Sequence, residues 1–178
     1  RSYVNSGSIL SDGGAVGLLA AGTTFQVGQT SGGTISLDIS GLLNGSATQD
    51  GLIDVTSTNG EGGQVLVNGN IDVTATSRSS TLANGAPIGD GGVVIYFSEN
   101  SASWKPDAII SAEGGNVGGN GGFVELSGLL DLQLSGSHIS TAAPNGETGI
   151  FSIDPVDITI SSSSTSNLSL NGSTYDSS

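Results

Sequence analysis

Residues 118–128 read GGNGGFVELSG, a glycine cluster followed by residues that alternate between apolar and polar. A glycine-rich loop that cradles a phosphate group must lead into a helix, because the helix N-terminus forms the anion site. Here residues 123–127 follow the last double glycine, and their alternation is typical of a β-strand. The context argues against a nucleotide-binding loop and indicates that the glycines form a corner of the fold.

The same pattern of glycine followed by an alternating strand recurs along the chain, and four of the five intervals lie between 27 and 30 residues. A nearly fixed period of this length is typical of repeat architectures. The last glycine before each predicted strand is Gly14, Gly33, Gly63, Gly92, Gly122 and Gly149.

Alignment of the six copies on these glycines gives two apolar columns, at the second and fourth positions after the glycine. The third position is mixed. Successive side chains of a strand point to opposite faces, so the two apolar columns are expected to face one core. The predicted core residues are Val16, Leu18, Ile35, Leu37, Val65, Val67, Val94, Tyr96, Val124, Leu126, Phe151 and Ile153.

Second strands with an apolar–Asp–apolar pattern follow in most copies, at 51–58, 70–76, 129–136 and 155–160. Helical periodicity is absent, and glycine, serine and threonine disfavour helices throughout. Short strands with glycine corners at a fixed period predict an all-β fold, a parallel β-helix or β-solenoid. We expect the solenoid domain to span 1–160, followed by a Ser-rich tail over 161–178 that is a linker or an added strand.

Composition and charge exclude several classes of function. The chain has 178 residues, a net charge of −13 and only three basic residues, so a phosphate-binding patch for nucleic acid is not expected. Hydrophobic residues make up 35% of the chain in short alternating runs, which favours an ordered fold despite the 30 glycines. There is no cysteine, and no apolar run approaches the ~20 residues that span a bilayer.

Three motifs occur in order within 91–160: GGNGGFVELSG at 118–128, APNG at 143–146 and GIFSIDPVDITI at 149–160. Together they resemble the filamentous-haemagglutinin-like exoproteins of bacterial two-partner secretion. The resemblance implies a right-handed β-helix, export through an outer-membrane partner pore, and a role as a secreted or cell-surface adhesin or matrix protein. The family's amino-terminal secretion motifs are not found, so we expect a carboxy-proximal piece of the solenoid.

An apolar patch is predicted on the outside of the solenoid, formed by Leu66, Val93, Ile95, Phe123 and Ile150. Exposed apolar patches of this kind mark partner or assembly surfaces. The alternative is that a flanking loop or the tail covers the patch.

The least regular stretch, 97–107, offers a second candidate site. Trp104, Lys105 and Asp107 are candidates for a binding loop. The alternative is a packing role for Trp104, which the family resemblance favours.

Other polar residues give weaker signals. The single histidine, His138, has no cysteine or second histidine to share a zinc ion and is interpreted as a surface turn residue. Aspartates that stack on neighbouring turns would repel one another and attract a cation, whereas solvated aspartates would only limit edge aggregation. The repeated aspartates are Asp38, Asp54, Asp72, Asp131 and Asp157, and the Asn-x-Ser sequons are at Asn44, Asn167 and Asn171.

The function that these observations favour is a non-catalytic adhesive rod that binds a host receptor, a glycan or sister cells. No catalytic residue, metal ligand or cofactor is predicted. The first alternative is a fibre subunit that stacks head to tail into a homopolymer. The second is a polysaccharide-cleaving β-helix enzyme, which requires two carboxylates across one groove.

Overall fold

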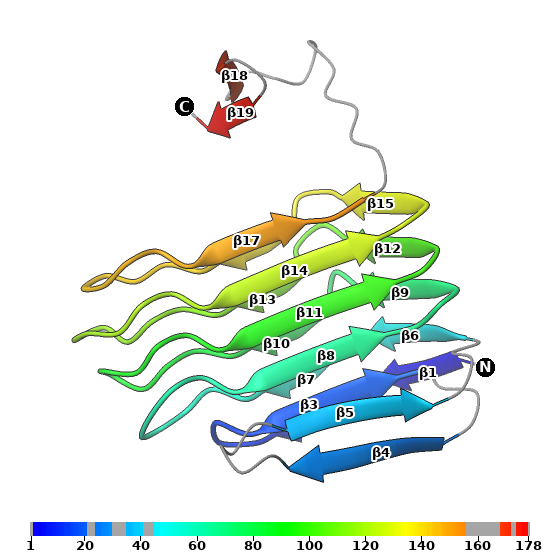
Figure 1. Cartoon of the computed structure of the whole chain (residues 1–178), viewed down its shortest axis with the longest axis horizontal. Helices are drawn as coiled ribbons and strands as arrows, with labels where there is room; N and C mark the ends of the chain where they lie inside the picture. The colour runs from blue at the N-terminus through cyan, green and yellow to red at the C-terminus, as the bar shows by residue number, and fades with distance from the viewer. Residues whose placement is uncertain are drawn as a thin grey trace.

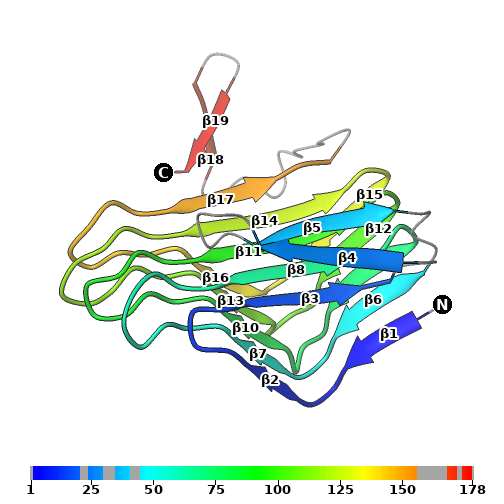
Figure 2. The same ribbon diagram turned by 60° about the horizontal axis from the view of Figure 1, so that its bottom comes forward.

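The computed structural model describes residues 2–20, 24–29, 35–40, 45–155, 168–171 and 174–177. In these ranges the chain forms strands and no helix. Three five-stranded parallel sheets contain most of the strands. As Figures 1 and 2 show, the strands of each sheet lie in ladder order, one turn above the next.

Each turn of the chain contributes one strand to each sheet. Sheet I consists of β1 (Ser2–Asn5), β6 (Ser46–Gln49), β9 (Asp72–Ala75), β12 (Ser101–Trp104) and β15 (Asp131–Leu134). Sheet II consists of β2 (Ser8–Leu10), β7 (Leu52–Asp54), β10 (Ser80–Leu82), β13 (Ile109–Ser111) and β16 (His138–Ser140). Sheet III consists of β3 (Ala15–Leu19), β8 (Gln64–Asn68), β11 (Val93–Ser98), β14 (Phe123–Gly128) and β17 (Ile150–Ile153). The predicted parallel β-solenoid is confirmed.

The glycine alignment sets the register of sheet III in all copies except the one at Gly33. Val65 pairs with Val94, and Val94 pairs with Val124, as the alignment requires. Strand β3, however, pairs directly with β8, so the copy that follows Gly33 does not add a strand to sheet III.

The copy that follows Gly33 forms a hairpin instead. Strand β5 (Ile35–Ser40) pairs antiparallel with β4 (Thr24–Gln29), and Leu37 lies opposite Val27. The assignment of Ile35 and Leu37 to the stacked columns was therefore wrong. Alternation with a period of two is the same in parallel and antiparallel strands, so the sequence pattern does not separate the two. Their side chains lie outside the described part of the structure.

The tail contains a second antiparallel pair. Strand β18 (Leu168–Asn171) pairs with β19 (Thr174–Ser177). The strand expected over 155–160 lies outside the described residues after Pro155.

The core runs between the three sheets as columns of stacked side chains. Of the predicted core residues, those on the central turns are fully buried: Val65, Val67, Val94, Tyr96, Val124 and Leu126. On the outer turns Val16, Leu18 and Phe151 are half-buried. Ile153 is 39% exposed because β17 is the edge strand of sheet III.

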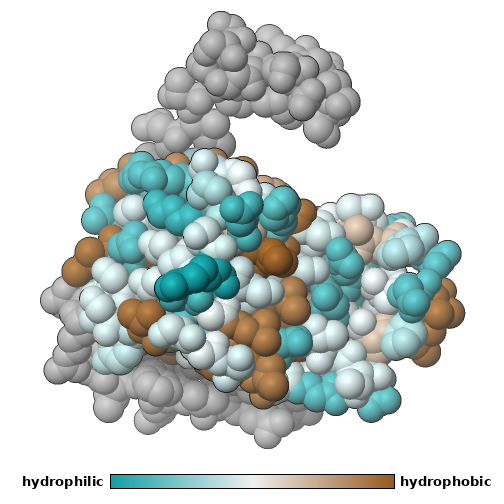
Figure 3. Space-filling model, turned by 180° about the vertical axis from the view of Figure 1, so that it is seen from behind, coloured by the Kyte–Doolittle hydropathy of each residue, from teal (hydrophilic) through white to brown (hydrophobic). Residues whose placement is uncertain are grey.

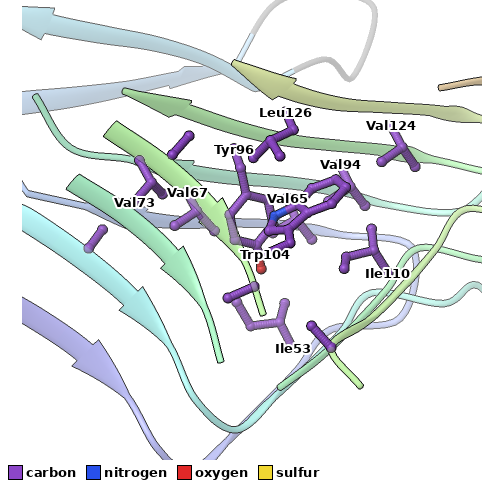
Figure 4. Packing of buried hydrophobic residues seen from close by; sticks show 14 of the residues in the cluster. Ile53, Val65, Val67, Val73, Val94, Tyr96, Trp104, Ile110, Val124 and Leu126 are labelled. Carbon is purple, nitrogen blue, oxygen red and sulfur yellow. The ribbon is translucent and has the colours of Figure 1, made fainter. Parts of the chain in front are cut away.

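Aromatic side chains pack among the buried aliphatic side chains of the core, as Tyr96 and Trp104 show in Figure 4. The rings of Tyr96 and Trp104 pack edge to face with centroids 5.4 Å apart, and Phe151 stacks on Trp104 at 5.8 Å. The hydroxyl groups of Tyr96 and Thr81 share a buried hydrogen bond of 2.8 Å, which joins sheet III to sheet II. Desolvation raises the pKa of the Tyr96 hydroxyl far above its ordinary range, so it remains protonated.

The double glycines close the loop that connects sheet II to sheet III. In successive turns Gly63 N donates to Val55 O, and Gly92 N donates to Ala83 O. At Gly92 a Cβ atom would overlap the backbone of Gly63 in the turn below. Glycine is required there because two turns approach backbone to backbone. Gly122 meets the backbone of Gly92 in the same way, so the glycine cluster at 118–122 is a corner, as predicted.

We predict that Gly92→Ala lowers the free energy of unfolding by about 3 kcal/mol, because the added methyl group displaces backbone from the turn below. Urea unfolding followed by the fluorescence of Trp104, the single tryptophan, measures the change. The matched control is Gly118→Ala, where an added Cβ meets nothing within 4 Å. Equal unfolding midpoints for the two variants would contradict this packing.

Candidate functional site

The outer face of sheet III carries the five residues predicted to form a partner surface. Ile95 pairs with Leu66 of the turn below. Val93 pairs with Phe123, which pairs in turn with Ile150. The structure thus brings all five onto one face, which is the sheet nearest the viewer in Figure 1. We call this set, Leu66, Val93, Ile95, Phe123 and Ile150, the apolar face.

Exposure differs across the apolar face. Ile150, on the edge strand, is 62% exposed, whereas the other four residues are half-buried. Phe97, also half-buried, follows Ile95 at the next outward position of β11 and extends the face. Phe97 was not among the predicted residues of this surface, although the alternation along β11 places it on this side.

A shallow groove of about 410 Å³ runs beside the apolar face, across the glycine corners. Val93, Phe123 and Ile150 line one side of the groove. Polar side chains from the residue before each double glycine, or its equivalent, line the other: Glu61, Asp90, Asn120 and Glu147. We call these four residues the polar column. They were not among the predicted site residues, although each stands at a fixed position just before the corner glycines.

Side-chain hydrogen bonds along the polar column connect successive turns. Asp90 Oδ1 accepts a hydrogen bond of 2.6 Å from the backbone N–H of Asn120. Asn120 Oδ1 accepts one of 3.0 Å from the N–H of Glu147. Asp90 and Asn120 therefore each cap the corner of the next turn, and these two bonds fix the edge of the groove.

A carboxyl pair lies farther along the face. Glu125 pairs with Ser152 in the register of sheet III, and Asp154 is the next outward residue after Ser152. Partial burial raises the pKa of Glu125 above its ordinary 4.5, and the charge of Asp154 raises it further. Glu125 therefore retains its proton to a higher pH than an exposed glutamate does.

The second predicted site, a binding loop from Trp104, Lys105 and Asp107, is not formed. Trp104 is fully buried in the core, so the packing alternative describes it. Asp107 is exposed and has a positive φ of 67°, which places it in a turn. Lys105 lies between them, half-buried.

His138 is exposed, as expected, but it begins strand β16 and is not in a turn. Its Nε2 lies 3.9 Å from a carboxylate oxygen of Asp107. Both side chains are more than two-thirds exposed, so this contact is weak.

The three repeated aspartates whose side chains the structure describes do not stack on neighbouring turns. Asp72 and Asp131 occupy the same column of sheet I, but Ser101 lies between them. Asp54 belongs to sheet II. The described residues contain no group of three or more His, Asp or Glu side chains able to hold a metal ion. Asp54, Asp72 and Asp131 therefore do not form the cation site that stacked aspartates would make.

Several predicted positions fall where no side chain is described. These are Asp38 and Asp157 among the repeated aspartates and all three sequon residues, Asn44, Asn167 and Asn171.

No family model, curated protein or solved structure matches the chain. The described residues include no helix that is long and apolar enough to cross a membrane. The class that the structure defines is the parallel β-solenoid, with a packed interior and an outer face that is apolar over several turns of sheet III.

We predict that Glu125→Gln raises the free energy of unfolding at neutral pH. A group whose pKa is raised by folding stabilises the fold below its unfolded pKa, and that stabilisation is lost as pH rises through the folded pKa. At neutral pH the charged Glu125 is therefore unfavourable, and glutamine removes the charge. Urea unfolding at acid and neutral pH tests this, with exposed Glu99→Gln as the matched control. A gain that is the same at both pH values contradicts the prediction.

Proposed function

We propose that the chain is a non-catalytic, adhesive segment of a rod-shaped secreted or cell-surface protein, and that the apolar face is its contact surface. The observation that carries this proposal is the alignment of apolar side chains from neighbouring turns on the outside of sheet III.

The stacked turns are suited to a mechanical role. Each inner strand of a sheet is held by parallel ladders on both sides, and the core columns continue from turn to turn. Such repeats transmit load along their length, since every turn contacts its neighbours through the same bonds.

The apolar face is suited to contact with a partner. Side chains that face solvent on a sheet are usually polar, and an apolar exception over several turns marks an interaction surface. The opposite side of the molecule, in Figure 3, shows hydrophobic residues scattered among hydrophilic ones. The partner is a host receptor, a glycan or a sister cell, and the family resemblance supports export through an outer-membrane pore.

We predict that beads coated with the purified chain adhere to epithelial cells or to one another, and that Ile150→Ser weakens adhesion about tenfold or more. The matched control is Ile109→Ser, because Ile109 is 44% exposed but lies on sheet II. Adhesion no greater than that of albumin-coated beads would contradict the proposal. Equal losses in the two variants would contradict the assignment to the apolar face.

A further inference from the structure

The peptide bond between Asp154 and Pro155 is the single Asp–Pro bond of the chain. The other prolines follow alanine or lysine. A proline nitrogen carries no N–H and is a tertiary amide, which is more basic than an ordinary peptide nitrogen. The carboxylate of a preceding aspartate can reach its own backbone carbonyl carbon in a five-membered ring. This bond is therefore labile in acid, and the groups around it determine its rate of cleavage.

The fold holds the Asp154 backbone against strand β14. The N–H of Asp154 donates to Leu126 O at 3.1 Å, and the hydroxyl of Ser127 donates to Asp154 O at 3.2 Å. Ser127 is fully buried, so its hydroxyl is fixed, whereas Asp154 is exposed to water. The carbonyl oxygen that would gain negative charge during attack thus already has a positioned hydrogen-bond donor.

A proton donor lies on the same face of sheet III. Glu125 is diagonal to Asp154, because it pairs with Ser152 two residues earlier. The groups that face Glu125 are Ile95 from β11, Ser152 from β17, and the charged Asp154. Two carboxyl groups in different environments, one exposed and one partly buried, suit the roles of carboxylate and acid.

We propose that the chain cleaves its own Asp154–Pro155 bond, with Asp154 as nucleophile, Ser127 as the donor to the carbonyl oxygen and Glu125 as the general acid. The inference is independent of the proposed adhesive function.

The reaction balances as a hydrolysis. A side-chain carboxylate oxygen of Asp154 attacks the backbone carbonyl carbon of the same residue, and a cyclic anhydride forms as the bond to Pro155 nitrogen breaks. Glu125 gives its proton to that nitrogen, directly or through one water molecule. Water then opens the anhydride, returns one proton to Glu125 and leaves the other on the new carboxyl group. The products end at Asp154 and begin at Pro155.

The pH dependence follows from the acid. Cleavage requires Glu125 to be protonated, so the rate falls as pH rises through its raised pKa. The reaction is intramolecular, and its rate does not depend on protein concentration.

We predict that the purified full chain, incubated in mildly acidic buffer, yields two fragments whose masses correspond to 1–154 and 155–178. Amino-terminal sequencing of the smaller fragment reads Pro-Val-Asp. Asp154→Ala abolishes cleavage. Glu125→Gln and Ser127→Ala each slow it about tenfold or more, and Glu125→Gln also removes the fall in rate that accompanies deprotonation of Glu125. Exposed Glu99→Gln is the matched control with an unchanged rate.

The unfolded chain separates catalysis by the fold from the intrinsic lability of Asp–Pro bonds. Incubation in urea at the same pH must slow cleavage about tenfold or more if the site contributes. Equal rates in the folded and unfolded chains overturn the proposal, as does an intact folded chain. An unchanged rate in Glu125→Gln also overturns it, provided that Trp104 fluorescence shows the variant to be folded.

Discussion

The structure depends on the close approach of successive turns at the glycine corners. At Gly92 and its equivalents the backbone of one turn lies where any side chain of the next would need to be. This approach allows the three sheets to keep one register, because each turn returns to the same height relative to its neighbour. Every column of side chains, inside and outside, follows from that register.

The same register explains why function is expected on the outside. The inward columns are filled by stacked aliphatic and aromatic side chains. The outward columns repeat as well. A residue type that recurs at one outward position of successive strands therefore forms a stripe along several turns. The apolar face and the polar column beside it are two such stripes, and they meet along one groove.

Much of the fold could be predicted from the glycine period, because the interval between corner glycines equals the number of residues in one turn of the solenoid. The β4–β5 hairpin could not, since alternation reads the same in antiparallel strands. Trp104 lies in a stretch without regular alternation, so the pattern did not assign its role, which its packing against Tyr96 and Phe151 shows. The five residues of the apolar face could be predicted from the sequence pattern. The side chains that surround Asp154 could be identified only in the structure. Ser127 and Glu125 come from the preceding turn and are distant from Asp154 in sequence.

The most direct test of the parallel register is an engineered disulfide between turns. The chain has no cysteine, so no native thiol competes with the introduced pair. Ala15 of β3 pairs with Gln64 of β8, although the β4–β5 hairpin lies between these two strands in the sequence. Paired residues of neighbouring strands are about 5 Å apart at Cα, within reach of a disulfide bond. The account predicts that Ala15→Cys with Gln64→Cys forms an intramolecular disulfide on mild oxidation, while Ala15→Cys with Val93→Cys, one turn farther, does not. A disulfide in the second variant and none in the first would contradict the register from which the whole account is built.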